Sequence, residues 1–355
     1  RYTSENSGLP EDLIFSVFQS REGQYWVGTL YGLASGTPGQ FSKFDEAIGG
    51  LSSNSVNTFS ETSDGSIWVG TDEGLNRLRP NKEKFEWINQ FTSPGLSNSI
   101  VMSLLSDGET LWIGTYDGGV NRLHLGTNKI EKFKHNPLDP SSVGANGITT
   151  FLKTNSGEVL IGTYGGGLSI FNEASSSFDN LKHDPENPSS LRSNNVIALY
   201  QDSLGYIWIG TEAGLSRFNQ EDRTFDQPKT DDASYAFLKS IIWAFLEADD
   251  GTLWMGSAGE GLTSWDIESR SELSADITRS STELDLPSSN IYGIQSDKQG
   301  DIWVSHNSGV SKIQISDNKV TNYGARDGLQ GSEFNIFHLH RIYGNLGLKR
   351  ADPEN

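Results

Sequence analysis

GSIWVGTDEGL, residues 65–75, returns with modest variation from one end of the chain to the other and decides the fold. Seven copies begin at Gly23, Gly65, Gly108, Gly157, Gly205, Gly251 and Gly300. Their anchor residues, Trp26, Trp68, Trp112, Leu160, Trp208, Trp254 and Trp303, are separated by 42, 44, 48, 48, 46 and 49 residues. This period is typical of the four-stranded blade of a β-propeller and is too long for a leucine-rich repeat.

Each copy can be divided into four short strands, which we name A to D in chain order. A run rich in β-branched and aromatic residues, such as 195–200, predicts strand A. A turn such as 62–65 leads to the Ile-Trp-Val run, strand B. Gly214 opens strand C at 214–218, because a tight B–C turn needs positive φ, and outer strands such as 319–323 close the blade. No 11-residue window shows the apolar period of a helix.

Seven sheets of this kind bury their faces only when they pack side by side in a ring. We therefore predict an all-β fold, a seven-bladed β-propeller of four-stranded antiparallel blades, over residues 1–330. Residues 331–355 form an exit segment. The repeat tryptophans should lie buried between blades: Trp26, Trp68, Trp112, Trp208, Trp254 and Trp303. Leu160 should loosen its seam locally, and Ser305-His306, in place of Gly-Thr, is interpreted as an end-of-ring variant.

Composition narrows the range of partners. The chain has 27 Lys plus Arg against 46 Asp plus Glu, a net charge of −19, which repels phosphates and excludes nucleic acid as a favoured partner. It has no Cys, so disulfides and thiolate chemistry are excluded. The sequence starts with Arg and shows no leader or apolar run of bilayer length, so we expect an excised fragment that meets a membrane only through segments outside it.

The repeated phrase G-x-[IL]-W-[IV]-G-T-x-x-G-L, with the linkers HNPLDPSSV (135–143) and HDPENPSSL (183–191), resembles the two-component regulator propeller repeats of bacterial sensors. The resemblance covers about residues 9–340, and DGLQGSEFN (327–335) is similar to the segment that leaves the family's last blade, before a β-sandwich and a membrane helix. It implies a periplasmic input module of an inner-membrane receptor. The output of such a receptor is a histidine kinase, a hybrid kinase or a diguanylate cyclase.

Propellers place their B–C turns and D–A connections on one face around the central channel, and variable residues there are candidates for recognition. The B–C turns offer aromatic, carboxylate and amide side chains, a combination that suits sugars. The candidate ligand-binding residues are Tyr31, Tyr116, Asp117, Tyr164, Glu212, His306 and Asn307, with Asp72, Glu73 and Glu260 in the same turns.

Tyr116 and Tyr164 are the favoured pair, because both follow Gly-Thr in adjacent blades and could present two rings side by side. The alternative is that any one of these side chains is an ordinary solvated turn residue. Trp243 belongs to a strand-A run, where a role in the core between blades is favoured over a role in the channel.

No catalytic set, metal site or cofactor is predicted. Asp249-Asp250 and Asp231-Asp232 are adjacent turn carboxylates, not the opposed pair that glycoside cleavage needs. His338 and His340 share a strand face without a further ligand nearby in sequence, so we interpret them as a surface pair. Residues 165–167, Gly-Gly-Gly, lack the Lys-Ser/Thr of a phosphate loop and are interpreted as a B–C turn.

Three functions remain open on the sequence. The first is a ligand-sensing module that recognises an oligosaccharide or another small molecule and signals through rearranged association of propellers, with a homodimer through the propeller faces. The second is a propeller enzyme, a lyase or a carbohydrate-active protein, because the fold does not fix the function. The third is a scaffold that responds to a protein partner. We favour the first and expect that this fragment is not an enzyme.

Overall fold

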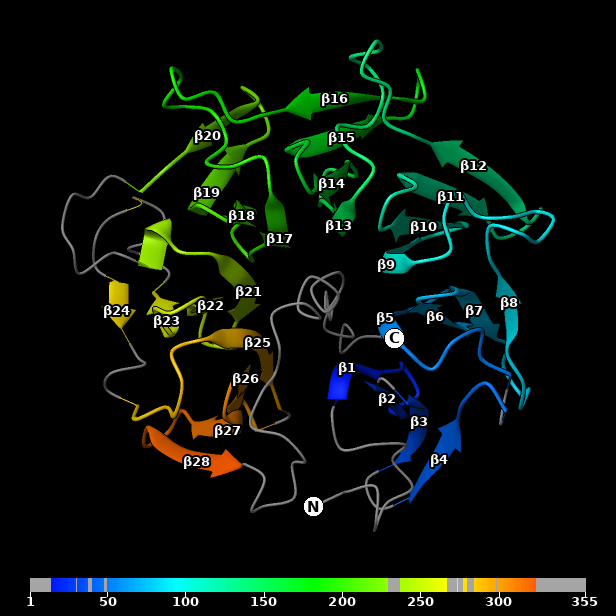
Figure 1. Ribbon diagram of the computed structural model, residues 1–355. Coiled ribbons are helices and arrows are strands. Elements are labelled where there is room, and N and C mark those ends of the chain that lie inside the picture. Colours follow the sequence, from blue (N-terminus) through cyan, green and yellow to red (C-terminus); the bar gives the residue numbers. More distant parts are fainter. Residues whose placement is uncertain are drawn as a thin grey trace.

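The computed structural model describes residues 14–29, 31–37, 40–47, 50–228, 237–266, 273, 277–279, 284–297 and 299–323. These residues form seven four-stranded antiparallel sheets arranged around a common centre (Figure 1). Helix within them is limited to a 3₁₀ turn at 237–239. The chain is a seven-bladed β-propeller, as predicted. The exit segment 331–355, with His338 and His340, lies outside the described residues, as does Asp231-Asp232.

Each blade uses four consecutive strands, from A at the centre to D at the rim (Figure 1). Strands A are β1 (Ile14–Gln19), β5 (Val56–Glu61), β9 (Val101–Asp107), β13 (Ile148–Lys153), β17 (Val196–Gln201), β21 (Ile242–Glu247) and β25 (Ile291–Ser296). Strands B are β2 (Tyr25–Thr29), β6 (Ile67–Thr71), β10 (Thr110–Thr115), β14 (Val159–Thr163), β18 (Ile207–Thr211), β22 (Leu253–Ser257) and β26 (Ile302–His306).

Strands C are β3 (Gly32–Thr37), β7 (Gly74–Leu78), β11 (Val120–His124), β15 (Leu168–Asn172), β19 (Gly214–Asn219), β23 (Leu262–Trp265) and β27 (Gly309–Gln314). Strands D are β4 (Gln40–Phe44), β8 (Glu86–Ile88), β12 (Lys129–Phe133), β16 (Ser177–Leu181), β20 (Thr224–Asp226), β24 (Ile277–Arg279) and β28 (Lys319–Tyr323). Among the described strands, the first and seventh sheets are each built from one continuous stretch of chain. Buried side chains packed between neighbouring sheets join blades 1 to 7 in chain order.

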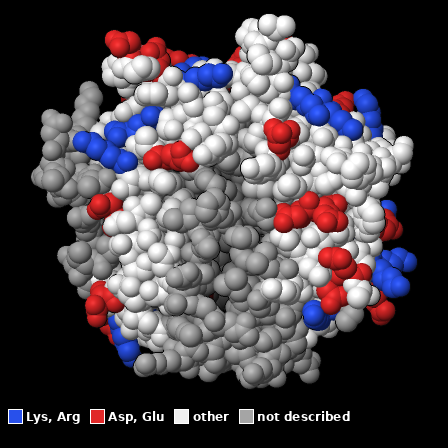
Figure 2. Space-filling model, viewed as in Figure 1, with Lys and Arg blue, Asp and Glu red and all other residues white. Residues whose placement is uncertain are grey.

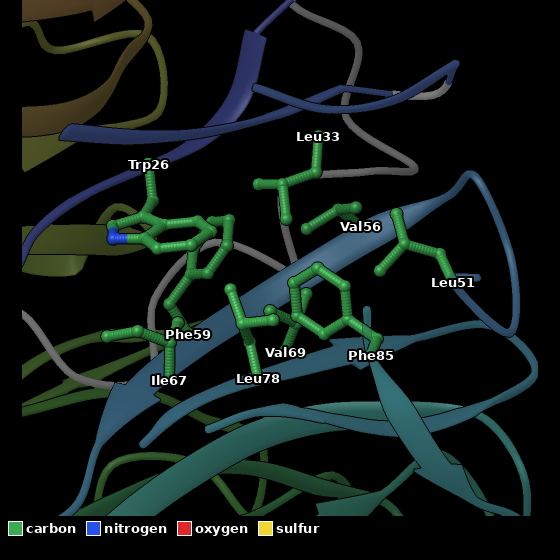
Figure 3. Close-up of a cluster of buried hydrophobic side chains, with 9 residues drawn as sticks. All are labelled: Trp26, Leu33, Leu51, Val56, Phe59, Ile67, Val69, Leu78 and Phe85. Carbon is green, nitrogen blue, oxygen red and sulfur yellow. The ribbon is translucent and has the colours of Figure 1, made fainter. Parts of the chain in front are cut away.

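Strand B carries the tryptophan that packs against the next blade. In the first seam, Trp26 and Leu33 of blade 1 face Phe59, Ile67 and Val69 of blade 2 (Figure 3). Side chains alternate along a strand, so Trp68 points to the opposite side and packs against blade 3. The same direction is kept around the ring, and five of the repeat tryptophans are at most 8% exposed: Trp26, Trp68, Trp112, Trp208 and Trp254.

The glycine two residues after the tryptophan allows this close approach. A β-carbon at Gly70 would lie 2.6 Å from Val101, the first residue of the inner strand of blade 3. Equivalent glycines in blades 3 to 6 meet the first residue of the next inner strand: Gly114 with Ile148, Gly162 with Val196, Gly210 with Ile242 and Gly256 with Ile291. Since adjacent blades nearly touch here, a larger residue would push them apart.

Blade 7 departs from this pattern. Ser305 takes the place of the close-approach glycine, and His306 takes the place of the following threonine. By the symmetry of the repeat, Trp303 faces the seam that closes the ring, yet it is only partly buried, unlike the other five tryptophans. The expectation that all six are buried is therefore wrong for Trp303. An added side chain at position 305 is consistent with a wider closing seam.

Blade 4 compensates for the loss of its tryptophan. Leu160 is fully buried and packs with Ile170, Ile207 and Ile209, so the expected loosening is not visible in its burial. In blade 2, the residue that pairs with Trp68 across the hairpin is Arg77, whose guanidinium carbon lies 4.9 Å from the centre of the tryptophan ring. In blade 4, the equivalent partner of Leu160 is Ile170. Without an aromatic face, a cation has nothing to stack on, and an aliphatic side chain fills the space instead.

The Trp208→Ala variant tests the seams. We expect a loss of about 3–5 kcal/mol in the free energy of unfolding, because the side chain is fully buried and leaves a cavity. The Trp303→Ala variant is the matched control and should lose clearly less. Urea denaturation followed by circular dichroism measures both, and equal losses would contradict a seventh seam that is less tightly packed.

Candidate functional site

The B–C turns are rigid because the last residue of strand B ties each turn together. Thr71 Oγ1 donates a hydrogen bond to the carbonyl of Gly74 (3.0 Å) and accepts one from the amide of Glu73 (3.3 Å). The donated bond recurs in Thr29, Thr115, Thr163, Thr211 and Ser257. At Gly74 a β-carbon would lie only 2.8 Å from the carbonyl oxygen of Ile88, so a larger residue would not fit there. Gly119 and Gly167 have φ near +77°, as a tight turn requires.

In five of the seven B–C turns, a backbone hydrogen bond ties the first residue of the turn to the start of the inner strand. The amide of Tyr116 donates to the carbonyl of Ile100 (3.0 Å), and the amide of Glu212 donates to that of Asn195 (3.1 Å). Asp72, Tyr164 and Ala258 make the equivalent bond. We call this repeat position the mouth position; its occupants are Leu30, Asp72, Tyr116, Tyr164, Glu212, Ala258 and Asn307, of which Leu30 lies outside the described residues.

The structure brings Tyr116, Tyr164 and Glu212 together in blades 3, 4 and 5. The tyrosines are 60% and 52% exposed. The negative charge of Glu212 raises the pKa of Tyr164, with further contributions from burial, a hydrogen bond to Glu212 and the nearby Tyr116. Glu212 Oε2 also accepts a bond from Asn195 Nδ2 at 2.5 Å. We call Tyr116, Tyr164, Asn195 and Glu212 the tyrosine–carboxylate site.

The inner strands of blades 5 to 7 form an apolar wall. Trp243 and Tyr292 have ring centroids 4.5 Å apart, and Ile197 packs with them. All three are the second residues of their strands A and are at most 4% exposed. Trp243 therefore belongs to the core between inner strands and not to the tryptophan seams. The Tyr292 hydroxyl donates to Asn307 Oδ1, which anchors the mouth position of blade 7.

Other predicted residues are more dispersed. Asp117 is exposed next to Tyr116, so it borders the tyrosine–carboxylate site. Tyr31 is 59% exposed but belongs to blade 1, with blade 2 between it and Tyr116. In blade 2, Asp72 accepts a hydrogen bond from Asn57 Nδ2 at 3.0 Å. The turn around Asp249-Asp250 is a simple A–B turn, in which Asp250 accepts a bond from the amide of Thr252.

His306 is not available to a ligand, although the sequence suggested it. Its side chain is fully buried. The amide of Ser308 donates to Nδ1 (3.1 Å), so the proton lies on Nε2, which faces Ser311 Oγ at 2.7 Å. Ser311 in turn donates to Asn322 Oδ1. His306 thus replaces the turn-holding threonine, and we leave it out of the candidate site.

Two contributors were missed by sequence reasoning. Asn195 orients Glu212, and Tyr292 orients Asn307, and both stand at the start of a strand A. Polar residues at the start of strand A were a usable signal, because that end of the strand meets the B–C turn. Among the described residues, no three His, Asp or Glu side chains are grouped as metal ligands. The described part of the chain also contains no helix long and apolar enough to cross a bilayer.

Burial lowers the pKa of His306 to about 4, below its ordinary value of 6.5. The unfolded chain therefore binds this proton more readily, so the stabilisation is complete above pH 6.5 and is lost as the pH falls toward 4. We expect this residue to account for a loss of up to about 3 kcal/mol. Comparing urea denaturation of the wild type and His306→Thr at about pH 7 and pH 4.5 isolates the effect. An identical pH dependence in the two proteins would refute it.

Comparison with known proteins agrees with the repeat. Three segments, residues 50–73, 190–213 and 285–308, match the family described as two component regulator propeller. Each segment runs from a D–A connection through strands A and B into the B–C turn. The chain therefore carries two-component regulator propeller repeats. A search of curated protein sequences finds no match.

Solved structures show the same fold. The extracellular domain of the putative hybrid two component system BT3049 from B. thetaiotaomicron superposes with a TM-score of 0.66 at 23% identity. The match covers 86% of this chain and 40% of that one, so the present chain spans less than half of its length. Virginiamycin B lyase from Staphylococcus aureus is also similar, with a TM-score of 0.58 at 12% identity, covering 83% of this chain and 92% of the lyase.

Proposed function

We propose that this propeller is the ligand-sensing part of a bacterial signal-transduction receptor. The observation that carries the proposal is the tyrosine–carboxylate site. It is formed by the B–C turns of repeats that match the two component regulator propeller family. Two half-exposed aromatic rings beside a fixed carboxylate supply both contact area and directional hydrogen bonding. The arrangement suits recognition of a small molecule at one face of a rigid ring.

The proposed ligand is an oligosaccharide or a similar polyhydroxylated molecule. Tyr116 and Tyr164 can cover the C–H faces of a sugar ring, while Glu212 and Asp117 accept bonds from its hydroxyl groups. Asn195 holds Glu212 in place before the ligand arrives. Such preorganisation lowers the entropy cost of binding.

We propose a periplasmic location, as the extracytoplasmic part of an inner-membrane receptor. The similar B. thetaiotaomicron structure is described as an extracellular domain of a putative hybrid two component system, which supports this placement by analogy. The kinase or cyclase output would belong to other parts of the receptor. The membrane would be reached through segments outside residues 1–355.

A rigid ring transmits a signal best by moving as a body. The described blades are tied by buried seams, so a ligand at the mouth changes more readily how two propellers meet than how the blades pack. We therefore propose signalling through the association of propellers in a homodimer. A scaffold that answers only to a protein partner is the alternative, and a stable dimer without any small-molecule response would favour it.

The enzyme alternative has one observation in its favour, the likeness of the fold to streptogramin B lyase, with a TM-score of 0.60 at 12% identity. At this identity the likeness extends to the fold alone. The tyrosine–carboxylate site pairs Glu212 with two hydrogen-bond donors, which suits binding. Incubation with a bound ligand, followed by mass spectrometry, separates the two functions, since a sensor returns the ligand unchanged.

Truncation of the aromatic rings tests the site. Tyr116→Ala and Tyr164→Ala should each weaken ligand binding by about 1–3 kcal/mol, because each removes one large contact surface. Unfolding should change little, since both rings are at least half exposed. Tyr31→Ala, an equally exposed tyrosine two blades away, is the control. Calorimetry with an identified ligand measures the affinities, and unaltered binding in both variants would move the site elsewhere.

Rearranged association is tested on the whole receptor ectodomain. Small-angle scattering with and without saturating ligand should show a change in the shape of the dimer, while circular dichroism of the propeller stays the same. An unchanged dimer shape at saturation would refute signalling by rigid-body movement.

A further inference from the structure

We propose that the tyrosine–carboxylate site prefers ligands that carry a cationic amine, such as amino sugars, over neutral and anionic ones. This inference rests on the proposed function and specifies the chemical class of ligand for the same site. Three observations support it: the neutral hydrogen-bond donors of Glu212, the two exposed tyrosine rings beside it and the carboxylates of the surrounding turns.

Among the residues that the structure describes, Glu212 accepts hydrogen bonds from neutral donors only. Its carboxylate receives hydrogen bonds from two neutral groups, the Asn195 amide and the Tyr164 hydroxyl. Neither donor carries charge, and within the described part of the chain no Lys or Arg forms an ion pair with Glu212. The charge of Glu212 is also the largest cause of the raised pKa of Tyr164. A cationic group on a ligand would therefore add a charge-assisted hydrogen bond that the described residues do not supply.

The two tyrosine rings add a second attraction for a cation. Tyr116 and Tyr164 expose 60% and 52% of their surface at adjacent mouth positions. An ammonium group is drawn to the electron-rich face of an aromatic ring, and aromatic rings combined with carboxylates recognise amines. A protonated amine can therefore donate to Glu212 while its neighbouring C–H groups cover the rings. A carboxylated or sulfated sugar would face repulsion at the same place.

The surroundings carry the same sign of charge. The seven B–C turns, residues 30–31, 72–73, 116–118, 164–166, 212–213, 258–260 and 307–308, contain no Lys or Arg and five carboxylates: Asp72, Glu73, Asp117, Glu212 and Glu260. In Figure 2, the charged side chains of the described residues that lie nearest the centre of the visible face are acidic, and most Lys and Arg lie toward the rim. Arg192 and Lys239 belong to D–A connections and not to the turns. The field at the mouth thus attracts cations.

Three tetrasaccharides of equal length test the charge preference. The probes are the glucosamine tetramer, which is cationic at neutral pH, its fully N-acetylated form, which is neutral, and tetragalacturonate, which is anionic. Isothermal titration calorimetry with the wild type should give the glucosamine tetramer an affinity about tenfold to a hundredfold higher than its acetylated form, the scale of one charge-assisted hydrogen bond. Tetragalacturonate should bind weakest.

Variants decide whether Glu212 causes the preference. In Glu212→Gln the ratio of cationic to neutral affinity should fall close to one, because the charge that attracts the amine is gone while an amide oxygen remains to accept hydroxyl hydrogen bonds. Glu109→Gln removes one charge from the A–B turn of blade 3, at the opposite end of the sheet, and should keep the wild-type ratio. A ratio that falls equally in both variants would assign the preference to the net charge of −19 and overturn the proposal.

The remaining outcomes separate this inference from the proposed function. Equal affinity for the cationic and neutral probes, with both lost in Tyr116→Ala, overturns the amine preference and leaves sugar binding at this site intact. An unchanged ratio in Glu212→Gln also overturns it. If none of the three probes binds at about 10 mM, a concentration that reveals very weak complexes, both the amine preference and the oligosaccharide proposal fail.

Discussion

The contact between strand B of one blade and strand A of the next is the constraint on which the rest of this propeller depends. The tryptophan fills the seam, and the glycine two residues later lets the strands approach. The next residue, a threonine or serine in six blades, locks the turn. The residue after that is the mouth position. The residues that the fold constrains, Trp-x-Gly-Thr, are thus followed directly by the mouth position, whose side chain is free to vary.

The repeat made the ring, its blade number and the B–C turns predictable, because each copy carries the same strand and turn chemistry. The proximity of Tyr116 and Tyr164 followed as well, since equivalent positions in adjacent blades must be neighbours. The close-approach role of Gly70 was not predictable, because the residue it meets, Val101, belongs to the next blade. Hydrogen bonds such as Asn195 to Glu212 likewise depend on how two strands are rotated relative to each other.

His306 shows that aligning the seven copies of the repeat can correct a prediction made from the type of residue alone. Histidine in a variable turn suggested recognition, but its position in the repeat is that of the turn-holding threonine. An imidazole can replace the hydroxyl because one nitrogen accepts from the turn amide and the other bonds Ser311. With Ser305 and the partly exposed Trp303, it sets the closing seam apart. Blades 3 to 5 lie across the ring from that seam (Figure 1), so the candidate site rests on regular, tightly packed blades.

The exposed turns of blades 3 to 5 and the buried inner strands of blades 5 to 7 differ in chemistry. Blades 3 to 5 expose Tyr116 and Tyr164 beside Glu212, whereas the apolar wall around Trp243 in the inner strands of blades 5 to 7 is buried, with the small Ala258 packed against it. Because the inner-strand bond fixes the backbone at most mouth positions, a substitution there changes chemistry without moving a blade.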